Sequence, residues 1–203
     1  MNDRAPVIAV AGIPGAGKSA LVSALASRMA AQVVEYDQFQ TLTRMSVREI
    51  EDWFRRGGDP NEFALIELID ELTRRTLKSG TEMRAVVLFE TPFGRLHRGT
   101  GGFIDLLVWV DTPFDVALSR AMLAAIEMFS RQNASGQASE FLAWQRQYLL
   151  NYPILRDMYL AQHKAIIADA ELIVDGRLTT LALADLVVGA LRQRSIPAYT
   201  NRP

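Results

Sequence analysis

The sequence of 203 residues contains no cysteine and no long apolar run. The absence of cysteine excludes disulfide bonds and thiolate metal sites. The longest apolar runs have about five residues, whereas a membrane-spanning helix needs about 20. The N-terminal segment also lacks the long apolar region and the small-residue cleavage site of a signal peptide. We therefore expect a cytoplasmic protein that does not associate with membranes.

The sequence also lacks an excess of either charge. With 22 Lys and Arg against 23 Asp and Glu, its formal net charge is −1, which gives no electrostatic reason to expect a nucleic acid as partner. Length and composition fit one soluble domain, expected over residues 1–194, with 195–203 as a flexible tail. The sequence leaves room for a homo-oligomer.

Short β-branched runs alternate with longer helical patterns along the chain. This alternation predicts an α/β fold in which helices cover a parallel sheet. Several of the five expected strands are almost entirely apolar, as strands buried on both faces are. The five are Val7–Ala11, Gln32–Tyr36, Arg84–Phe89, Leu106–Val110 and Glu171–Val174.

Several helix boundaries carry start or stop signals. Ser46 with Glu49 has the pattern of a capping box at the start of a helix. Asp59 is expected to cap a second helix, with Pro60 at its first position. Further expected boundaries and segments are Ser79–Gly80 at a helix end, Thr112–Pro113 at a helix start, the polar loop Arg131–Ser139, and the helices Glu140–Leu149, Pro153–Lys164 and Leu181–Arg192.

The segment from Gly12 to Ser19 fits the pattern G-x-x-x-x-G-K-[ST] without a mismatch. It follows the first expected strand and opens a helical stretch, the context that a phosphate-binding loop requires. Its backbone N–H groups and the helix N-terminus would bind phosphate oxygens. Lys18 would reach the β- and γ-phosphates of ATP, and the hydroxyl of Ser19 would bind Mg²⁺. The expected nucleotide contacts are Gly12, Ile13, Pro14, Gly15, Ala16, Gly17, Lys18, Ser19 and Ala20.

Acidic residues lie at the ends of the second and third expected strands. Asp37 follows the second strand, and ligands of open α/β sheets bind at the carboxyl ends of strands. Glu35 is a rival carboxylate within that strand. Glu90 ends the third strand, where it would hold Mg²⁺ through a water molecule. The alternative for both Asp37 and Glu90 is a purely local role in a turn or a cap.

From about Val7 to Gly176, the chain resembles the uridine kinase group of P-loop kinases, which includes phosphoribulokinase and pantothenate kinase. The segments that carry the resemblance are the phosphate loop, Asp37-x-Phe39, Gly58–Phe63, the run Val110–Arg120 (V-D-T-x-x-D-x-x-L-S-R), Gln147–Tyr148 and Ala170–Glu171. The resemblance implies a P-loop NTPase fold with three layers, a strand order of 2-3-1-4-5 and a helical lid at about 124–140. It also implies that Asp37 is the catalytic base.

The chain departs from the group mainly in its lid and acceptor site. Ala124, Ala125 and Phe129 replace lid arginines, so that Arg131, with Arg120, is left to stabilise the moving phosphoryl group. Acceptor contacts are expected from Asp59, Arg95, His97 and Tyr148. The cluster Arg95, His97 and Arg98 would suit an anionic acceptor, although scattered charges on a solvated loop explain it equally well.

Two functions are compatible with these residues. The first is a kinase that uses ATP and Mg²⁺ to phosphorylate a hydroxyl group of a small molecule, either a nucleoside or another metabolite. The second is a nucleotide-binding regulatory protein that keeps the kinase fold but has lost efficient transfer, an alternative suggested by the missing lid arginines.

Overall fold

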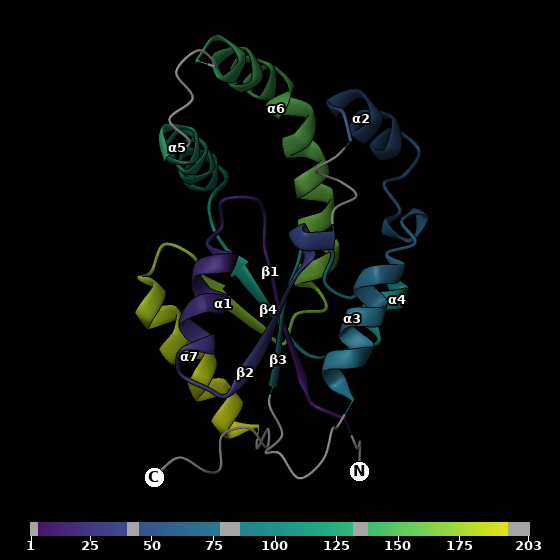
Figure 1. The fold of residues 1–203 in the computed structure, drawn as a ribbon, viewed down its shortest axis with the longest axis vertical. Helices are drawn as coiled ribbons and strands as arrows, with labels where there is room; N and C mark the ends of the chain where they lie inside the picture. The colour runs from purple at the N-terminus through teal and green to yellow at the C-terminus, as the bar shows by residue number, and fades with distance from the viewer. Residues whose placement is uncertain (1–3, 40–44, 78–85, 132–137, 195–203) are drawn as a thin grey trace.

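The computed structural model describes residues 4–39, 45–77, 86–131 and 138–194. A parallel sheet with the strand order β2-β3-β1-β4-β5 forms the middle of three layers. Helices α1 and α7 cover one face, and α3, α4 and the lower part of α6 cover the other (Figure 1). The fold class and the strand order predicted from the sequence are therefore confirmed. The strands are β1 Val7–Ala11, β2 Ala31–Glu35, β3 Val86–Thr91, β4 Ile104–Asp111 and β5 Leu172–Asp175.

The central strands are apolar because both faces of the sheet are covered. Every residue of β1 and β3 is buried, including Glu90 and Thr91 at the end of β3. The predicted strand ended at Phe89, so Glu90 lies inside the strand rather than after it. The predicted start at Arg84 lies outside the described residues. The other predicted strands match to within two residues at each end, the usual uncertainty of such boundaries.

Most helices and short 3₁₀ turns follow the predicted signals, with two exceptions described below, while η1 and α4 had no predicted signal. The helices and turns are α1 Lys18–Ala26, η1 Tyr36–Phe39, α2 Val47–Arg55, η3 Pro60–Glu62, α3 Ile66–Thr76, α4 Arg98–Gly101, α5 Phe114–Arg131, α6 Ala138–Ile167 and α7 Thr180–Gln193. The capping box before α2 is present, with both the Ser46 side chain and the Glu49 side chain in place. This helix start is therefore confirmed.

The first exception is the helix predicted from Asp59. Asp59 caps only the short turn η3, and α3 begins at Ile66. Between them Phe63 is extended and Leu65 has a φ of 45°, which interrupts the helix. The carbonyl of Phe63 accepts a hydrogen bond from His97, and the Leu65 side chain is buried. Tertiary contacts therefore override the local helical pattern. The predicted end at Ser79–Gly80 lies outside the described residues.

The second exception is α6, which is one helix of 30 residues where two were predicted. Pro153 lies inside it and removes a single backbone donor. Figure 1 shows that α6 changes direction between its first and second halves, which is the usual effect of an internal proline. The predicted polar loop Arg131–Ser139 is shorter, because α5 includes Arg131 and α6 begins at Ala138; residues 132–137 lie outside the described part.

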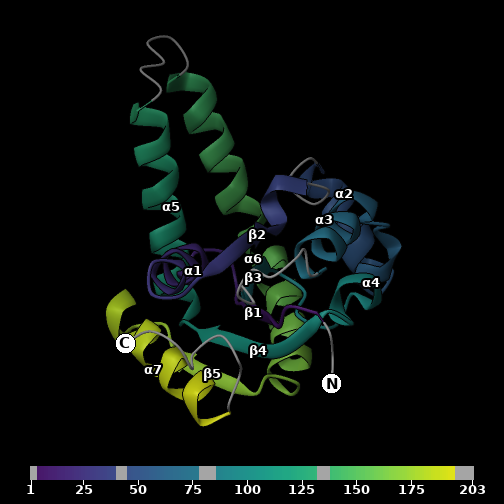
Figure 2. The ribbon, with the colours of Figure 1, turned by 60° about the horizontal axis from the view of Figure 1, so that its bottom comes forward.

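Helices α5 and α6 form a hairpin that projects beyond the carboxyl edge of the sheet (Figures 1 and 2). Phe129 of α5 stacks on Phe141 of α6, with their ring centroids 4.5 Å apart. The hairpin contains the described residues of the lid expected at about 124–140, and their role as a lid stays a prediction. None of the helices in the described ranges is long and apolar enough to cross a membrane.

Candidate active site

The loop between β1 and α1 takes its shape from its glycines. Gly15 has a φ of 79° and Gly17 a φ of 101°, backbone conformations that residues other than glycine rarely adopt. A Cβ atom on Gly15 would lie 2.0 Å from the carbonyl oxygen of Ala117 at the start of α5. The loop therefore needs glycine at both positions for its backbone conformation, and at Gly15 also because Ala117 packs closely against it. Gly17 is also the N-cap of α1, so the helix N-terminus opens directly onto the loop.

Thr112, which directly follows β4, holds the same loop by a hydrogen bond. Its hydroxyl donates a 3.0 Å hydrogen bond to the carbonyl oxygen of Ala16, and the side chain is buried. The sequence predicted only a helix start at Thr112–Pro113. The V-D-T run marked this threonine, but which carbonyl its hydroxyl would bind depends on how α5 packs against the loop. Thr112 is therefore a site residue that sequence reasoning missed.

Lys18, Ser19 and Glu90 meet at the carboxyl edge of the sheet. The hydroxyl of Ser19 donates a 3.0 Å hydrogen bond to Oε1 of Glu90, and Nζ of Lys18 lies 4.0 Å from the same oxygen. Nζ also donates to the carbonyl of Ile13 at 3.2 Å. Both charged side chains are largely buried, with exposed fractions of 13% for Lys18 and 10% for Glu90.

Burial shifts the acidity of both groups. Desolvation lowers the pKa of Lys18, although the charges of Glu90 and Asp37 act in the opposite direction. Desolvation likewise raises the pKa of Glu90, and the nearby charges of Asp37 and Glu35 raise it further, against the effects of Lys18 and Ser19. Holding these charges in a poorly hydrated place costs free energy, and such perturbed pairs are typical of functional sites.

The oxygens of Ser19 and Glu90 fit a magnesium ion. Hydroxyl and carboxylate oxygens are the ligands that Mg²⁺ prefers, and the ion usually takes its remaining ligands from water and nucleotide phosphates. The described residues contain no group of three or more side chains that could hold a metal by themselves. This arrangement suits an ion that arrives with a nucleotide.

Two further carboxylates lie beside this group. Glu35, the last residue of β2, is in register with Glu90 of β3, so the two are neighbours across the strands. Glu35 accepts a 2.7 Å hydrogen bond from the side chain of Gln38. Asp37 is an exposed residue of η1, and its charge acts on both Lys18 and Glu90. The structure thus brings the candidate base close to the phosphate loop.

Comparisons with known proteins show which folds this chain resembles. A family model described as the ATPase family associated with various cellular activities (AAA) matches residues 8–89. No curated protein matches the sequence. Three similar solved structures are a shikimate kinase from Aquifex aeolicus vf5 (16% identity, TM-score 0.51, 94% of this chain and 99% of that one), a sugar kinase from Janibacter sp. HTCC2649 (15%, 0.52, 98% and 99%) and a shikimate kinase from Bacteroides thetaiotaomicron (14%, 0.53, 92% and 98%).

The fold is that of the P-loop kinases. At identities of 14–16% the likeness shows the fold alone. The resemblance to the uridine kinase group in particular therefore remains a proposal.

The two arginines expected to act on the phosphoryl group lie far apart on α5. The guanidinium of Arg120 donates a 2.8 Å hydrogen bond to the carbonyl of Gly176 and lies close to Gly17 of the phosphate loop. Arg131 ends the helix eleven positions later, about 16 Å further along the axis at 1.5 Å per residue. Its side chain is 80% exposed and pairs with Glu127. The structure therefore brings Arg120, but not Arg131, to the phosphate loop.

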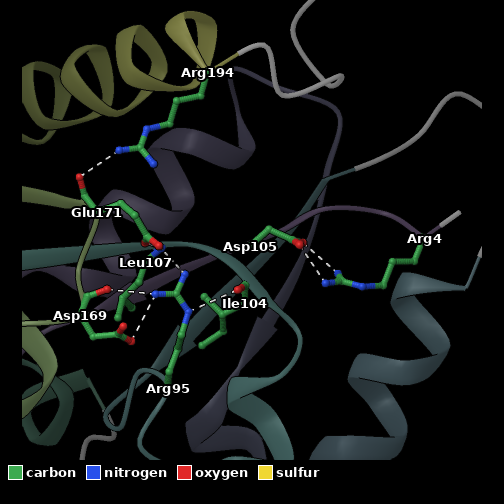
Figure 3. A network of polar contacts seen from close by, with 8 residues as sticks. All are labelled: Arg4, Arg95, Ile104, Asp105, Leu107, Asp169, Glu171 and Arg194. Atoms are coloured by element: carbon green, nitrogen blue, oxygen red, sulfur yellow. Dashed lines mark hydrogen bonds and ion pairs between the residues drawn. The ribbon is translucent and has the colours of Figure 1, made fainter. Parts of the chain in front are cut away.

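Arg95 lies at the opposite edge of the sheet, away from the phosphate loop. Its guanidinium binds the carboxylate of Glu171 at 2.7 Å and both the carboxylate and the carbonyl of Asp169 (Figure 3). Its Nε donates to the carbonyl of Ile104, the first residue of β4. At this edge the parallel strands begin, whereas the phosphate loop follows the end of β1. The structure therefore does not bring Arg95 to the site.

His97 is buried, and both of its ring nitrogens are engaged. Nε2 lies 2.9 Å from the carbonyl oxygen of Phe63 and must donate to it, so Nδ1 accepts from the backbone N–H of Thr100 at 3.2 Å. Asp59 caps η3 by accepting two hydrogen bonds from Asn61, which lower the pKa of its carboxyl group. Both residues thus have a structural task.

Tyr148 lies on α6 and is half-buried. Its ring stacks on Trp144, with centroids 5.8 Å apart, and its hydroxyl is hydrogen-bonded to Tyr159. Burial raises the pKa of Tyr148, so its hydroxyl is neutral at physiological pH. Helix α6 contacts α2 above the carboxyl edge of the sheet. Tyr148 therefore lies on the helix that contacts α2 on this side.

Proposed function

We propose that this protein is a cytoplasmic kinase that uses ATP and Mg²⁺ to phosphorylate a hydroxyl group of a small molecule. The observation that carries the proposal is the constellation at the end of β1 and β3. A glycine loop opens onto the N-terminus of α1, and Lys18 and Ser19 both contact Glu90. Asp37 lies close enough for its charge to act on this group. The P-loop kinase fold supports the same reaction class.

Each residue has a definite task in this reaction. The loop amides and Lys18 hold the β- and γ-phosphates, and Ser19 and Glu90 hold the metal. The bound Mg²⁺ supplies charge neutralisation for the phosphates. Asp37 accepts the proton of the acceptor hydroxyl. The oxygen of that hydroxyl bonds to the γ-phosphorus while the bond from this phosphorus to the β–γ bridging oxygen breaks, which yields the phosphorylated acceptor and ADP.

A nucleotide-dependent regulatory protein is the second candidate, because of the position of Arg131. The residue left to act as lid arginine is exposed, paired with Glu127 and remote from the phosphate loop. Arginines that close over the γ-phosphate can contribute about 10³-fold or more to phosphoryl transfer. A lid without that contact would bind ATP and transfer its phosphate slowly.

The experiment that separates the two candidates is a screen for ADP release in the presence of ATP, Mg²⁺ and individual alcohols. Acceptors include nucleosides, sugars and amino alcohols, and their phosphorylated products are identified by mass spectrometry. A kinase shows acceptor-dependent ADP release well above the rate without acceptor. If ATP binds with Mg²⁺ but no acceptor raises this rate, the regulatory function is favoured.

A further inference from the structure

Two of the three basic groups that the sequence offered to an anionic acceptor, Arg95 and His97, have other partners. Arg95 binds Glu171 and Asp169 at the opposite edge of the sheet, and His97 is buried with both nitrogens engaged. Arg98 lies on α4 beside Asp59, whose carboxyl group feels its charge. The loop after β3 therefore does not present a cluster of cations to the acceptor.

The described arginines of α2 and α6, the two helices above the carboxyl edge of the sheet, also have other positions or partners. On α2, Arg48 is two positions from Ile50 and five from the buried Trp53, so helical geometry places it on the outer face. The other two basic residues at the end of α2 form ion pairs, Arg55 with Glu51 and Arg56 with Glu62.

On α6, the face that carries Tyr148 is uncharged. Arg146 is two positions before Tyr148 and is exposed on the opposite side of the helix. The guanidinium of Arg156 lies over the ring of Phe114, 5.6 Å from its centroid, at the base of α5. Tyr148 and Tyr159 offer neutral hydroxyl groups instead.

Carboxylates, by contrast, gather at this edge. Glu35 and Glu90 are neighbours across β2 and β3, and Asp37 follows two residues after Glu35. Among the described residues, the cation that faces them is Lys18, which the γ-phosphate requires. A carboxylate or phosphate on the acceptor would therefore be repelled by Glu35 and Asp37, and the described part of the chain offers no further cation to offset this repulsion.

We propose that the acceptor is an uncharged or positively charged alcohol, and that the carboxylates of Glu35 and Asp37 exclude alcohols that bear a carboxylate or a phosphate. This inference rests on the proposed kinase function and names its substrate class. It sets the chain apart in chemistry from a kinase of shikimate, an alcohol that bears a carboxylate.

The test compares acceptors that differ mainly in charge. Matched pairs are methyl shikimate with shikimate, panthenol with pantothenate, and glucose or glucosamine with glucuronate and glucose 6-phosphate. Acceptor-dependent ADP release is measured for each at constant ATP and Mg²⁺, and the product is identified by mass spectrometry. We expect the uncharged or cationic member of any active pair to have a kcat/KM at least tenfold higher.

A variant that lacks one charge shows whether electrostatic repulsion or the shape of the site causes the preference between the two acceptors. Glu35→Gln keeps the size of the side chain and should narrow the ratio between the two members of the active pair by about five- to tenfold, the effect of one nearby unit charge in a partly hydrated site. Glu67→Gln, on the exposed first turn of α3, removes a charge of the same kind elsewhere and should leave the ratio unchanged.

The outcomes separate this inference from the proposed function. An anionic member with the higher kcat/KM would overturn the inference while the kinase function stands. A ratio that is the same in Glu35→Gln and wild type would overturn the electrostatic cause. If no acceptor raises ADP release although ATP binding is intact, the kinase function is overturned and the inference falls with it.

Discussion

The hydroxyl of Ser19 donates a 3.0 Å hydrogen bond to the carboxylate of Glu90, although 71 positions separate the two residues in the sequence. This contact joins the phosphate loop to the end of β3. Both oxygens suit Mg²⁺, and neither has another side-chain hydrogen bond that would compete with the metal among those found in the described residues. Metal binding should therefore replace or lengthen the hydrogen bond between Ser19 and Glu90.

Glu90→Gln should raise the Mg²⁺ concentration needed for half-maximal ATP binding by about 10- to 100-fold, the usual effect of losing a residue that orients a metal or its water. The amide keeps the size of the side chain and can still accept a hydrogen bond from Ser19. The measurement is a Mg²⁺ titration of the affinity for a fluorescent ATP analogue. Glu67→Gln serves as control, and an unchanged midpoint in Glu90→Gln would remove Glu90 from the metal site.

Lys18→Met should lower turnover by about 100-fold or more and weaken ATP binding, because the γ-phosphate loses its charged contact. The free energy of unfolding should not fall. Burial lowers the pKa of Lys18, which means that the charged ammonium group is less favourable in the folded protein than in the unfolded chain. Chemical denaturation and ATP titration are measured on the same samples. A folded variant with wild-type ATP affinity would show that the loop does not bind the phosphates.

Asp37→Asn should leave the affinities for ATP and Mg²⁺ nearly unchanged and reduce kcat by about 100-fold or more, the usual contribution of a positioned base. Asp37 is exposed on η1 and has no role in the core, so the variant should fold. The decisive measurement is kcat with an active acceptor, compared with the ATP affinity. If turnover remained normal, the base would lie elsewhere, and Glu35 would be tested next.

Arg95→Met tests whether this arginine has a structural or a substrate-binding role. We expect a loss of about 1–2 kcal/mol of unfolding free energy at neutral pH, since Glu171 and Asp169 lose their partner, and no change in the KM for the acceptor. Desolvation by itself would raise the pKa of Glu171, but hydrogen bonds from the backbone of Leu107 and from Arg95 outweigh it, so the pKa is lowered. Its ionised form therefore stabilises the fold above the normal pKa of glutamate.

This stabilisation disappears as the pH falls through the lowered pKa of Glu171, so the difference between Arg95→Met and wild type should shrink below about pH 4. Urea denaturation at several pH values measures it. A raised KM with unchanged stability would instead return Arg95 to the acceptor site.

The sequence predicted the sheet and the phosphate loop because their signals are local. The first strand is buried and apolar, and the glycine loop and Lys18 follow it directly. The other strands are indicated by their β-branched residues. The roles of Thr112 and Arg95 could not be predicted in this way. Thr112 binds the carbonyl of Ala16, 96 positions away, and Arg95 binds Glu171, 76 positions away. These partners depend on tertiary packing, which no spacing in the sequence shows.

Helical propensity misled the prediction at two places for a related reason. The pattern after Asp59 is helical, but the hydrogen bond from His97 to the carbonyl of Phe63 and the buried side chain of Leu65 hold the chain out of a helix. At Pro153 the opposite occurred. Packing of Leu155 and Met158 against the core keeps α6 continuous across a residue that usually ends a helix.

Arg131 should behave differently in a kinase and in a regulatory protein. Arg131 lies about 16 Å beyond Arg120 along α5, so it can reach the γ-phosphate only if the hairpin of α5 and α6 closes over the site. In a working kinase, this contact forms in the transition state, and Arg131→Ala should therefore lower kcat by about 10-fold to 10³-fold while ATP affinity changes little. Arg146→Ala removes an exposed arginine from the facing helix of the same hairpin and is the matched control, expected to keep the wild-type rate. Turnover with an active acceptor and ATP affinity are measured for all three proteins. A wild-type rate in Arg131→Ala, in a protein that does phosphorylate its acceptor, would show that Arg120 and Lys18 carry the positive charge at the transition state and that the assignment of the lid arginine is wrong.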